Sequence, residues 1–316
     1  MNRLVLLGTA CVLVACSRSA QFEQDQKYYK DYSNGYPSET QNPSDQISKM
    51  GQPKKRVVVF NFWNDTPVTH NGIGRFSANE LRRDLFATRR MILPTDIQEN
   101  LETANYVQGE QVKVAQLMQA GRKLGVSVIV IGRIARIVYR HRGDEIGVLR
   151  RSQSLAAADV EIKIFDVNAG REVMAVGKSG EASSNNLSAL EHEKLTDPQY
   201  RAELTQVAVR NATRQLVPEV IRAVEKMSWQ GQVAKVSGNR VYVNAGLASG
   251  LVAGDILKIL TQGDDIYDPR TGAFLGRSKG QMKGTIEVVE FIGKDAAIGL
   301  VHTGGAFKKG DLIKLY

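Results

Sequence analysis

Cysteine is almost absent from this chain of 316 residues, which contains only Cys11 and Cys16. Cys11 lies within an apolar stretch at residues 4–13 that is typical of a secretory signal, so we predict that it is removed with that signal. The remaining chain would keep one cysteine and could form no internal disulfide. A small disulfide-scaffolded protein is therefore excluded, and a chain of this length can bury a sizeable core without cross-links.

Histidine is scarce as well, and the familiar catalytic motifs are missing. None of the four histidines has the spacing of a metal-ligand pair: His70, His141, His192 and His302. Gly177-Lys178-Ser179 resembles the end of a phosphate-binding loop, but that motif needs a glycine where Glu172 stands. The G-x-S-x-G pattern of serine hydrolases does not occur. A hydrolase whose two catalytic carboxylates are brought together by the fold stays an open alternative. We expect a protein that is not an enzyme and that holds no metal and no cofactor.

Long apolar runs are also missing, because the run at residues 4–13 is about half of the ~20 residues that a transmembrane helix needs. Arg3 precedes this run, as in a signal peptide. The residues that end and follow the run resemble the lipobox of bacterial lipoproteins: Leu13, Val14, Ala15 and Cys16. This pattern predicts cleavage before Cys16 and attachment of acyl chains such as palmitate to its thiol, whereas an ordinary signal peptide is the alternative. Ser17 after the cysteine is typical of outer-membrane sorting, so we expect a protein anchored by lipid on the periplasmic face of the outer membrane.

Composition divides the chain into four segments. Residues 17–52 are rich in Ser, Gln, Asn, Asp and Tyr and show no sustained apolar period, which is typical of a flexible tether. The segments that we predict are a lipoprotein signal peptide at 1–15, a lipidated tether at 16–52, a mixed α/β (α+β) domain at 53–229, and a smaller all-β, barrel-like domain at 230–316.

The third segment alternates between strand and helix patterns. Its predicted strands are residues 57–62, 126–139 and 156–166, the last in a hairpin with 172–176. Its predicted helices are residues 75–88, 111–124 and 197–228. Pro218 lies inside the last helical pattern, so we expect a kink or break near Leu216.

The fourth segment has no helix pattern and is punctuated by glycines. Its predicted strands are residues 232–236, 240–244, 256–260, 284–292, 296–302 and 312–315. Within it, residues 254–260 (GDILKIL) are repeated at 310–316 (GDLIKLY), and each copy indicates a turn that starts a strand. A compact β-barrel follows from this spacing of short strands.

The net charge of +9 lies mainly in the third segment. Six arginines near one predicted strand connection form a candidate site for an anionic partner: Arg133, Arg136, Arg140, Arg142, Arg150 and Arg151. A solvated hairpin loop is the simpler interpretation, since Asp144 and Glu145 offset part of the charge. Nucleic acid is not an expected partner, because the chain carries an export signal and no aromatic stacking motif accompanies the arginines.

Four stretches of the α/β segment, in their order, resemble the CsgG family, the curli production assembly/transport component. They are VVVFNFWN at 57–64, the glycines of Gly72-Ile73-Gly74, AGRKLGVSVIVIGRI at 120–134 and VEIKIFDVNAGREV at 160–173. Ala169 departs from the family, whose turn usually has threonine before the glycine. The β-segment is similar to the small C-terminal domain of flagellar assembly protein T, through VYVNAGLASGLVAGD at 241–255 and YDPRTGAFLG at 267–276.

These resemblances imply a ring-forming, homo-oligomeric lipoprotein that works with other envelope assembly proteins. The family's best-known activity is a secretion pore built from membrane β-hairpins. The corresponding inserts here, residues 139–157 and 178–197, are charged or polar and fit lipid poorly. We therefore expect a non-enzymatic assembly or scaffold component of a flagellar or curli-type export apparatus. A curli-type pore subunit and a lipoprotein activator of a cell-wall synthase are the alternatives.

Overall fold

The computed structural model describes residues 53–68, 72–94, 101–109, 111–143, 152–186, 195, 197–272 and 274–316, with the backbone alone at 141–143, 152–153 and 184–186. The predicted signal peptide, the lipobox and the tether lie outside these residues. No helix in the described ranges is long and apolar enough to cross a bilayer.

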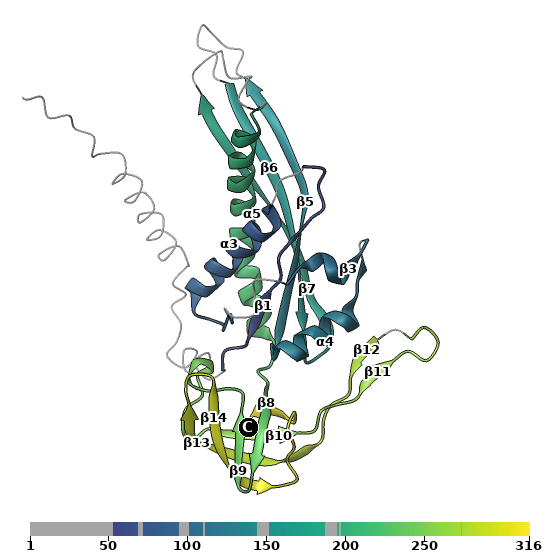
Figure 1. Cartoon of the computed structure of the whole chain (residues 1–316), viewed down its shortest axis with the longest axis vertical. Helices are drawn as coiled ribbons and strands as arrows, with labels where there is room; N and C mark the ends of the chain where they lie inside the picture. The colour runs from purple at the N-terminus through teal and green to yellow at the C-terminus, as the bar shows by residue number, and fades with distance from the viewer. Residues whose placement is uncertain are drawn as a thin grey trace, which may run out of the picture. The chain divides into compact units, whose positions relative to one another are not determined.

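A sheet with the strand order β1-β5-β6-β7 forms the centre of the first half (Figure 1). Strand β1 (Val57–Val59) runs parallel to β5 (Val128–Gly143), and the short β2 (Trp63–Asn64) continues that pairing farther along β5. Strands β6 (Ser152–Asp166) and β7 (Arg171–Asn186) follow in antiparallel hairpins. These three strands of 15 or 16 residues extend well beyond β1 and β2.

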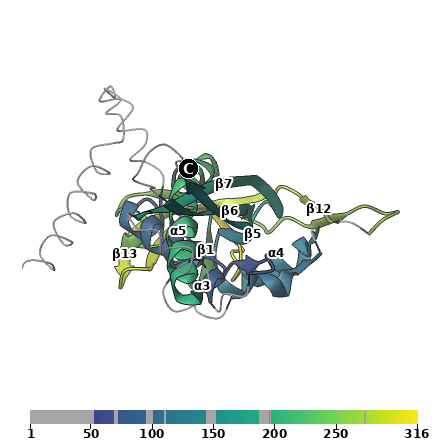
Figure 2. The same ribbon diagram turned by 90° about the horizontal axis from the view of Figure 1, so that it is seen from above.

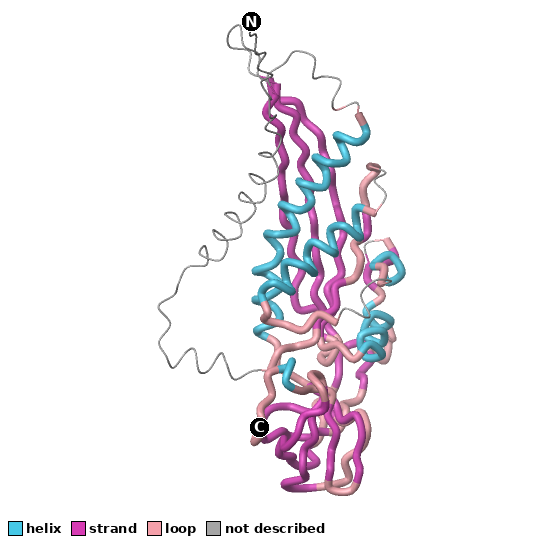
Figure 3. The backbone as a smooth tube through the Cα atoms, turned by 60° about the vertical axis from the view of Figure 1, so that its left-hand side comes forward, coloured by secondary structure: helices cyan, strands magenta, loops and turns pink. Residues whose placement is uncertain are grey.

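Two helices cover one face of this sheet, which we call the inner face (Figure 2). They are α3 (Ile73–Thr88) and α5 (Pro198–Lys226), and α5 runs along the long strands in Figure 3. The Asp197 carboxylate accepts a hydrogen bond from the Gln199 backbone N–H at 2.9 Å, and Pro198 occupies the first turn, so α5 begins where the sequence predicts.

Helix α5 continues through Pro218, so the expectation of a break near Leu216 is wrong, while a kink there stays a prediction. Proline removes one backbone hydrogen bond and costs about 3 kcal/mol in a helix interior. The turns on either side of it bury four apolar side chains against the inner face, each worth about 1.5–3 kcal/mol when fully buried: Leu216, Val217, Val220 and Ile221. Burial therefore outweighs the lost hydrogen bond.

Helix α5 lies unusually close to β7 at Gly180. A Cβ atom added there would lie 2.2 Å from the Ala212 nitrogen and 2.3 Å from the Ala208 oxygen. Glycine at this position and alanines on the helix allow the two backbones to meet.

Side chains of α5 also reach over the edge of β7. The Asn211 amide donates to the Glu181 carbonyl at 2.8 Å, and the Gln215 amide donates to the Ser179 carbonyl at 2.8 Å. Because β7 ends the strand order of the described sheet, these two carbonyl groups are among those that an added strand would use.

The opposite, outer face is covered only at one end. Helix α4 (Val114–Leu124) packs there on a second apolar cluster that includes Phe60 and Ile129. The 3-10 helix η1 (Thr103–Tyr106) and the small hairpin of β3 (Val107–Gln108) and β4 (Gln111–Val112) lie beside it. The helix predicted from residue 111 begins at Val114, because residues 111 and 112 belong to β4.

The second half closes into a barrel with the order β10-β13-β14-β9-β8-β15. Its strands are β8 (Gly231–Ser237), β9 (Arg240–Val243), β10 (Ile256–Leu260), β13 (Met282–Ile292), β14 (Ala296–Gly304) and β15 (Leu312–Leu315). A separate two-stranded sheet of β11 (Asp265–Tyr267) and β12 (Phe274–Arg277) and a short helix η3 (Leu247–Ser249) also belong to this half of the chain. The mixed α+β character and the C-terminal barrel are confirmed, while the division into two domains stays a prediction because residues 52–316 form one compact unit.

The sequence repeat has a direct structural meaning in this barrel. Strands β10 and β15 pair antiparallel with Lys258 opposite Lys314, so a local two-fold axis passes through that pair. The glycine before each strand has a positive φ, 93° at Gly254 and 90° at Gly310.

The aspartate that follows each of these glycines accepts from the backbone three residues earlier. Asp255 Oδ2 accepts from the Val252 N–H at 2.8 Å, and Asp311 Oδ2 accepts from the Lys308 N–H at 2.7 Å. The repeat therefore encodes two equivalent turns that start the two paired strands.

Candidate functional site

Beyond helix α4, the outer face of β5, β6 and β7 is open to solvent. The alternation of a strand sends every second side chain to this face. On β7 these side chains are small or polar for the most part, and all are exposed: Val173, Ala175, Gly177, Ser179, Glu181 and Ser183. No helix or strand among the described residues covers them.

Charged groups on this face are paired with each other across the strands. Arg133 Nε lies 2.9 Å from Glu161 Oε2, and its NH1 lies 3.2 Å from Asp65 Oδ2. Arg136 Nε lies 2.6 Å from Asp159 Oδ2. Opposite charges in register on neighbouring strands stabilise the pairing of those strands.

Asp159 is held in its ionised form. The Ser179 hydroxyl donates to its Oδ1 at 2.6 Å, and this bond together with Arg136 lowers the pKa of the Asp159 carboxyl below its usual value. A general acid at neutral pH needs the opposite shift. Asp159 therefore joins β6 to β5 through Arg136 and to β7 through Ser179, and its lowered pKa does not suit a general acid.

The six predicted arginines do not form one free cationic patch. Arg133 and Arg136 are engaged by carboxylates, and Arg140 is exposed farther along β5. Only the backbone of Arg142 is described, and Arg150 and Arg151 lie outside the described residues. Binding of an anionic partner stays a prediction for all six.

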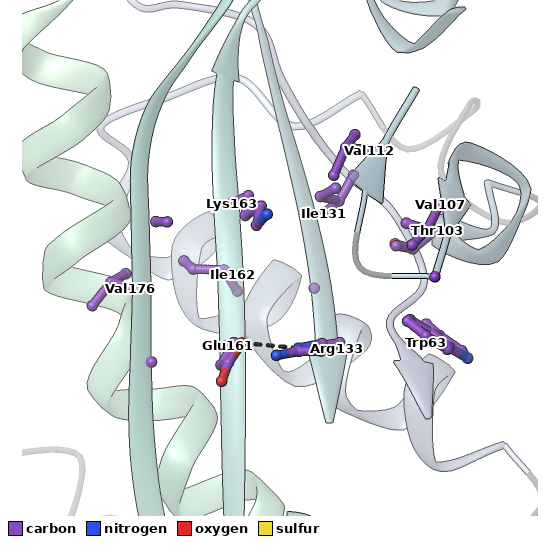
Figure 4. Close-up of a pocket in the computed structure, with 14 residues that line it drawn as sticks. Trp63, Thr103, Val107, Val112, Ile131, Arg133, Glu161, Ile162, Lys163 and Val176 are labelled. Carbon is purple, nitrogen blue, oxygen red and sulfur yellow. Dashed lines mark hydrogen bonds and ion pairs between the residues drawn. The ribbon is translucent and has the colours of Figure 1, made fainter. Parts of the chain in front are cut away.

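A cavity of about 370 Å³ lies where the outer face meets η1 and the β3–β4 hairpin. Figure 4 shows Ile131 of β5 in its middle, with Val112 and Val107 beside it and Trp63 of β2 below. The Arg133–Glu161 ion pair lies along its lower side. Its volume falls in the range of small-molecule sites, roughly 300–1,000 Å³.

Two polar groups of this cavity have no partner in the part of the chain that the structure describes. Thr103 is 2% exposed, and its Oγ1 makes no hydrogen bond there. Lys163 of β6 lines the opposite side and forms no ion pair with a described carboxylate. Among the described residues of the lining, Arg133 pairs with Glu161, whereas Lys163 pairs with no carboxylate.

Sequence reasoning missed this cavity. Trp63, Thr103 and Lys163 are separated by dozens of residues and belong to no motif. Only the parallel pairing of β2 with β5 and the return of the chain through η1 bring them together. No signal in the sequence alone connects them.

The most strongly shifted basic groups lie elsewhere and have structural roles. Burial lowers the pKa of Arg82 to about 10, and its Nε donates to the Val59 carbonyl at 3.1 Å, which fastens α3 to β1. Burial also lowers the pKa of Lys55, against the opposing effect of Glu225 and Asp166. In the described ranges no group of three His, Cys, Asp or Glu side chains could hold a metal ion.

Comparisons with known proteins find only weak similarity, and only to solved structures. No family model and no curated protein matches the chain. Protein CT253 from Chlamydia trachomatis is 14% identical, over 54% of this chain and 98% of that one, with a TM-score of 0.34. The PelC dodecamer from Paraburkholderia phytofirmans is 15% identical, over 53% and 89%, with a TM-score of 0.28. Lipoprotein GNA1162 from Neisseria meningitidis is 11% identical, over 45% and 92%, with a TM-score of 0.26. These scores establish no family for the chain, and the resemblance to the CsgG family stays a prediction.

Proposed function

We propose that the protein is a non-enzymatic assembly component of the bacterial envelope, anchored by lipid at Cys16 to the periplasmic face of the outer membrane. In this proposal, copies of the chain associate through the open outer face of β5, β6 and β7 and present a common scaffold to other envelope proteins. The observation that carries the proposal is that no helix or strand of the described residues covers this long face and that its charges are paired across the strands. The lipobox and the resemblance to the CsgG family support the proposed location at the outer membrane.

The chemistry of the outer face suits contact with protein. Small side chains such as Ala157, Ala175 and Ser179 let another backbone approach, and Val173 is 40% exposed. Carboxylates and guanidinium groups alternate across the strands, so the surface carries both signs and can complement a second copy of itself.

The same chemistry disfavours a membrane-facing role. Arg136 and Asp159 occupy the middle of the face, and a basic side chain at the midplane of a membrane barrel costs about 2–4 kcal/mol. The proposed scaffold therefore differs from a secretion pore, although both would form rings.

The lipid anchor is tested by replacing Cys16 with serine in cells that process lipoproteins. Because acyl chains on this cysteine are the proposed hold on the membrane, Cys16→Ser is expected to move the protein from the salt-washed membrane fraction to the soluble fraction. Fractionation followed by immunoblotting measures this. Full retention of the variant on salt-washed membranes would show that the anchor is elsewhere.

The association is tested by placing a bulky charge on the outer face. Ala157→Arg should block close approach of a second copy, so the full-length protein in detergent should sediment as a monomer rather than an oligomer. Asn239→Arg adds the same side chain at the exposed β8–β9 turn and is expected to leave the oligomer intact. A wild-type protein that is monomeric at all concentrations would sink the scaffold proposal, and steady conductance in planar bilayers would favour the pore instead.

A further inference from the structure

Four segments of the chain meet where its described part begins. The Lys54 N–H donates to the Ser249 carbonyl of η3 at 2.6 Å. The Ile92 N–H donates to the Lys55 carbonyl at 2.9 Å, which brings the end of α3 alongside. At the tip of the β13–β14 hairpin, the Lys294 carbonyl accepts from a backbone N–H of η3 at 2.8 Å. We call these segments together the junction: residues 54–56, 86–92, 247–252 and 292–295.

The junction exposes several large apolar side chains. Four of them have exposed fractions between 48% and 66%: Phe86, Leu247, Val252 and Ile292. Single exposed apolar side chains are common on soluble proteins, but a group of them marks a surface that contacts another protein or a membrane. The junction is therefore a candidate interaction surface.

The charge of the junction is strongly positive. Its segments contain six basic residues and a single acidic one, Asp295, which lies 3.9 Å from Arg56. Three of the basic side chains are exposed to solvent: Lys54, Arg89 and Lys294. Apolar side chains beside an excess of basic ones suit the surface of an anionic membrane, where apolar groups enter the headgroup region and cations meet the phosphates.

The place of the junction in the chain favours a lipid surface over a second copy. The described part begins at Pro53, next to Lys54, and residues 16–52 join it to Cys16, the proposed site of lipid attachment. A tether of that length could extend to about 120 Å, so the acyl chains alone would not decide which side of the fold faces the membrane. A second contact, close to the point where the tether enters the fold, would decide it.

We propose that the junction lies against the phospholipid surface of the membrane. Its apolar side chains enter the headgroup region, and its lysines and arginines lie at the lipid phosphates. The choice of the membrane rests on the proposed lipid anchor. To that anchor the junction adds a contact that is weaker, sensitive to salt and able to orient the fold.

The test measures flotation with lipid vesicles, using the Cys16→Ser chain without residues 1–15, the predicted signal peptide. This protein has no acyl chain and is expected to float with vesicles of phosphatidylcholine and phosphatidylglycerol in equal parts. Binding to phosphatidylcholine alone should be at least about tenfold weaker, and high salt should release the protein, because the basic side chains act on anionic lipid. No flotation with the anionic vesicles, or equal flotation with both kinds, overturns the proposal.

Variants place the binding at the junction. Leu247→Ser should weaken binding to the anionic vesicles about fivefold through lost apolar burial, and Lys294→Gln about fivefold through lost charge. The matched controls are Leu275→Ser, at a leucine of β12 that is 62% exposed, and Lys309→Gln, at an exposed lysine before β15. Neither control should change the binding. Equal losses in the controls, or no loss in the two junction variants, would show that lipid does not bind here.

Failure of the junction and failure of the anchor give different results. The anchor is read from salt-resistant retention in cells, whereas the vesicle assay uses protein that lacks the anchor. Cys16→Ser could therefore release the protein from salt-washed membranes while the vesicle assay refutes the junction, or the reverse. If Leu247→Ser converted an oligomer into a monomer and left vesicle binding intact, the junction would be a contact between copies and the proposal would be wrong.

Discussion

Replacing Asp311 with alanine is expected to lower the free energy of unfolding by about 3 kcal/mol. The Asp311 side chain is 8% exposed, and its Oδ2 lies 2.6 Å from the ammonium nitrogen of Lys283, whose side chain is 16% exposed. Removing the carboxylate leaves a mostly buried cation without its counter-charge and also frees the Lys308 N–H. Chemical denaturation of the full-length protein, followed by circular dichroism, measures the change.

The local two-fold axis of the barrel supplies the control for this prediction. Asp255 occupies the equivalent turn and accepts the equivalent backbone hydrogen bond, from Val252, but no described lysine pairs with it. Asp255→Ala should therefore cost only about 1 kcal/mol, the usual loss for a capping carboxylate. Equal losses at the two aspartates would mean that the Lys283 ion pair adds nothing to the stability of the barrel.

Gly180→Ala is expected to destabilise the protein by about 3 kcal/mol, at the upper end of the usual cost of overpacking. The added methyl group would lie 2.2 Å from the Ala212 nitrogen, and both nearest groups belong to the backbone of α5. Because a helix backbone cannot rotate away as a side chain can, α5 must move off β7. The change should lower the denaturation midpoint and speed proteolysis of the α5 region.

Gly177→Ala is the matched control, three residues away on the same strand. There the nearest atom to an added methyl group is Glu161 Cγ at 3.1 Å, the middle of a flexible side chain on the outer face. The free energy of unfolding should change by no more than about 0.5 kcal/mol. If Gly177→Ala were as harmful as Gly180→Ala, the close approach of α5 would not be the cause.

Much of the fold could be predicted from the sequence because local signals agreed with it. The Asp197-Pro198 pair marks the start of α5, and the GD repeat marks the start of β10 and β15. The predictions that differ from the structure fail because of tertiary contacts. Pro218 stays inside a helix because its neighbours are buried, and β7 runs ten residues beyond the predicted end at Val176 because Gly180 and Ala182 pack under α5.

The candidate site was predictable only in part, for a physical reason. The arginines of β5 attract attention as a cluster, yet their cross-strand carboxylates come from Asp65, Asp159 and Glu161, and only the register reveals the pairing. Thr103 and Lys163 are ordinary residues in sequence. What distinguishes them is that neither has a side-chain partner among the described residues, and that is a property of three-dimensional packing.

The two amides of α5 that bind the β7 carbonyls bear on how copies of this chain would associate in the proposed assembly. An exposed edge strand invites endless addition, one strand after another, as in amyloid fibres. Asn211 and Gln215 occupy that edge at Glu181 and Ser179, so stacking along this direction is blocked at its middle. In the proposed association, contact would then be made through a face, where it can close into a ring, and the helix would favour a finite assembly over an open filament.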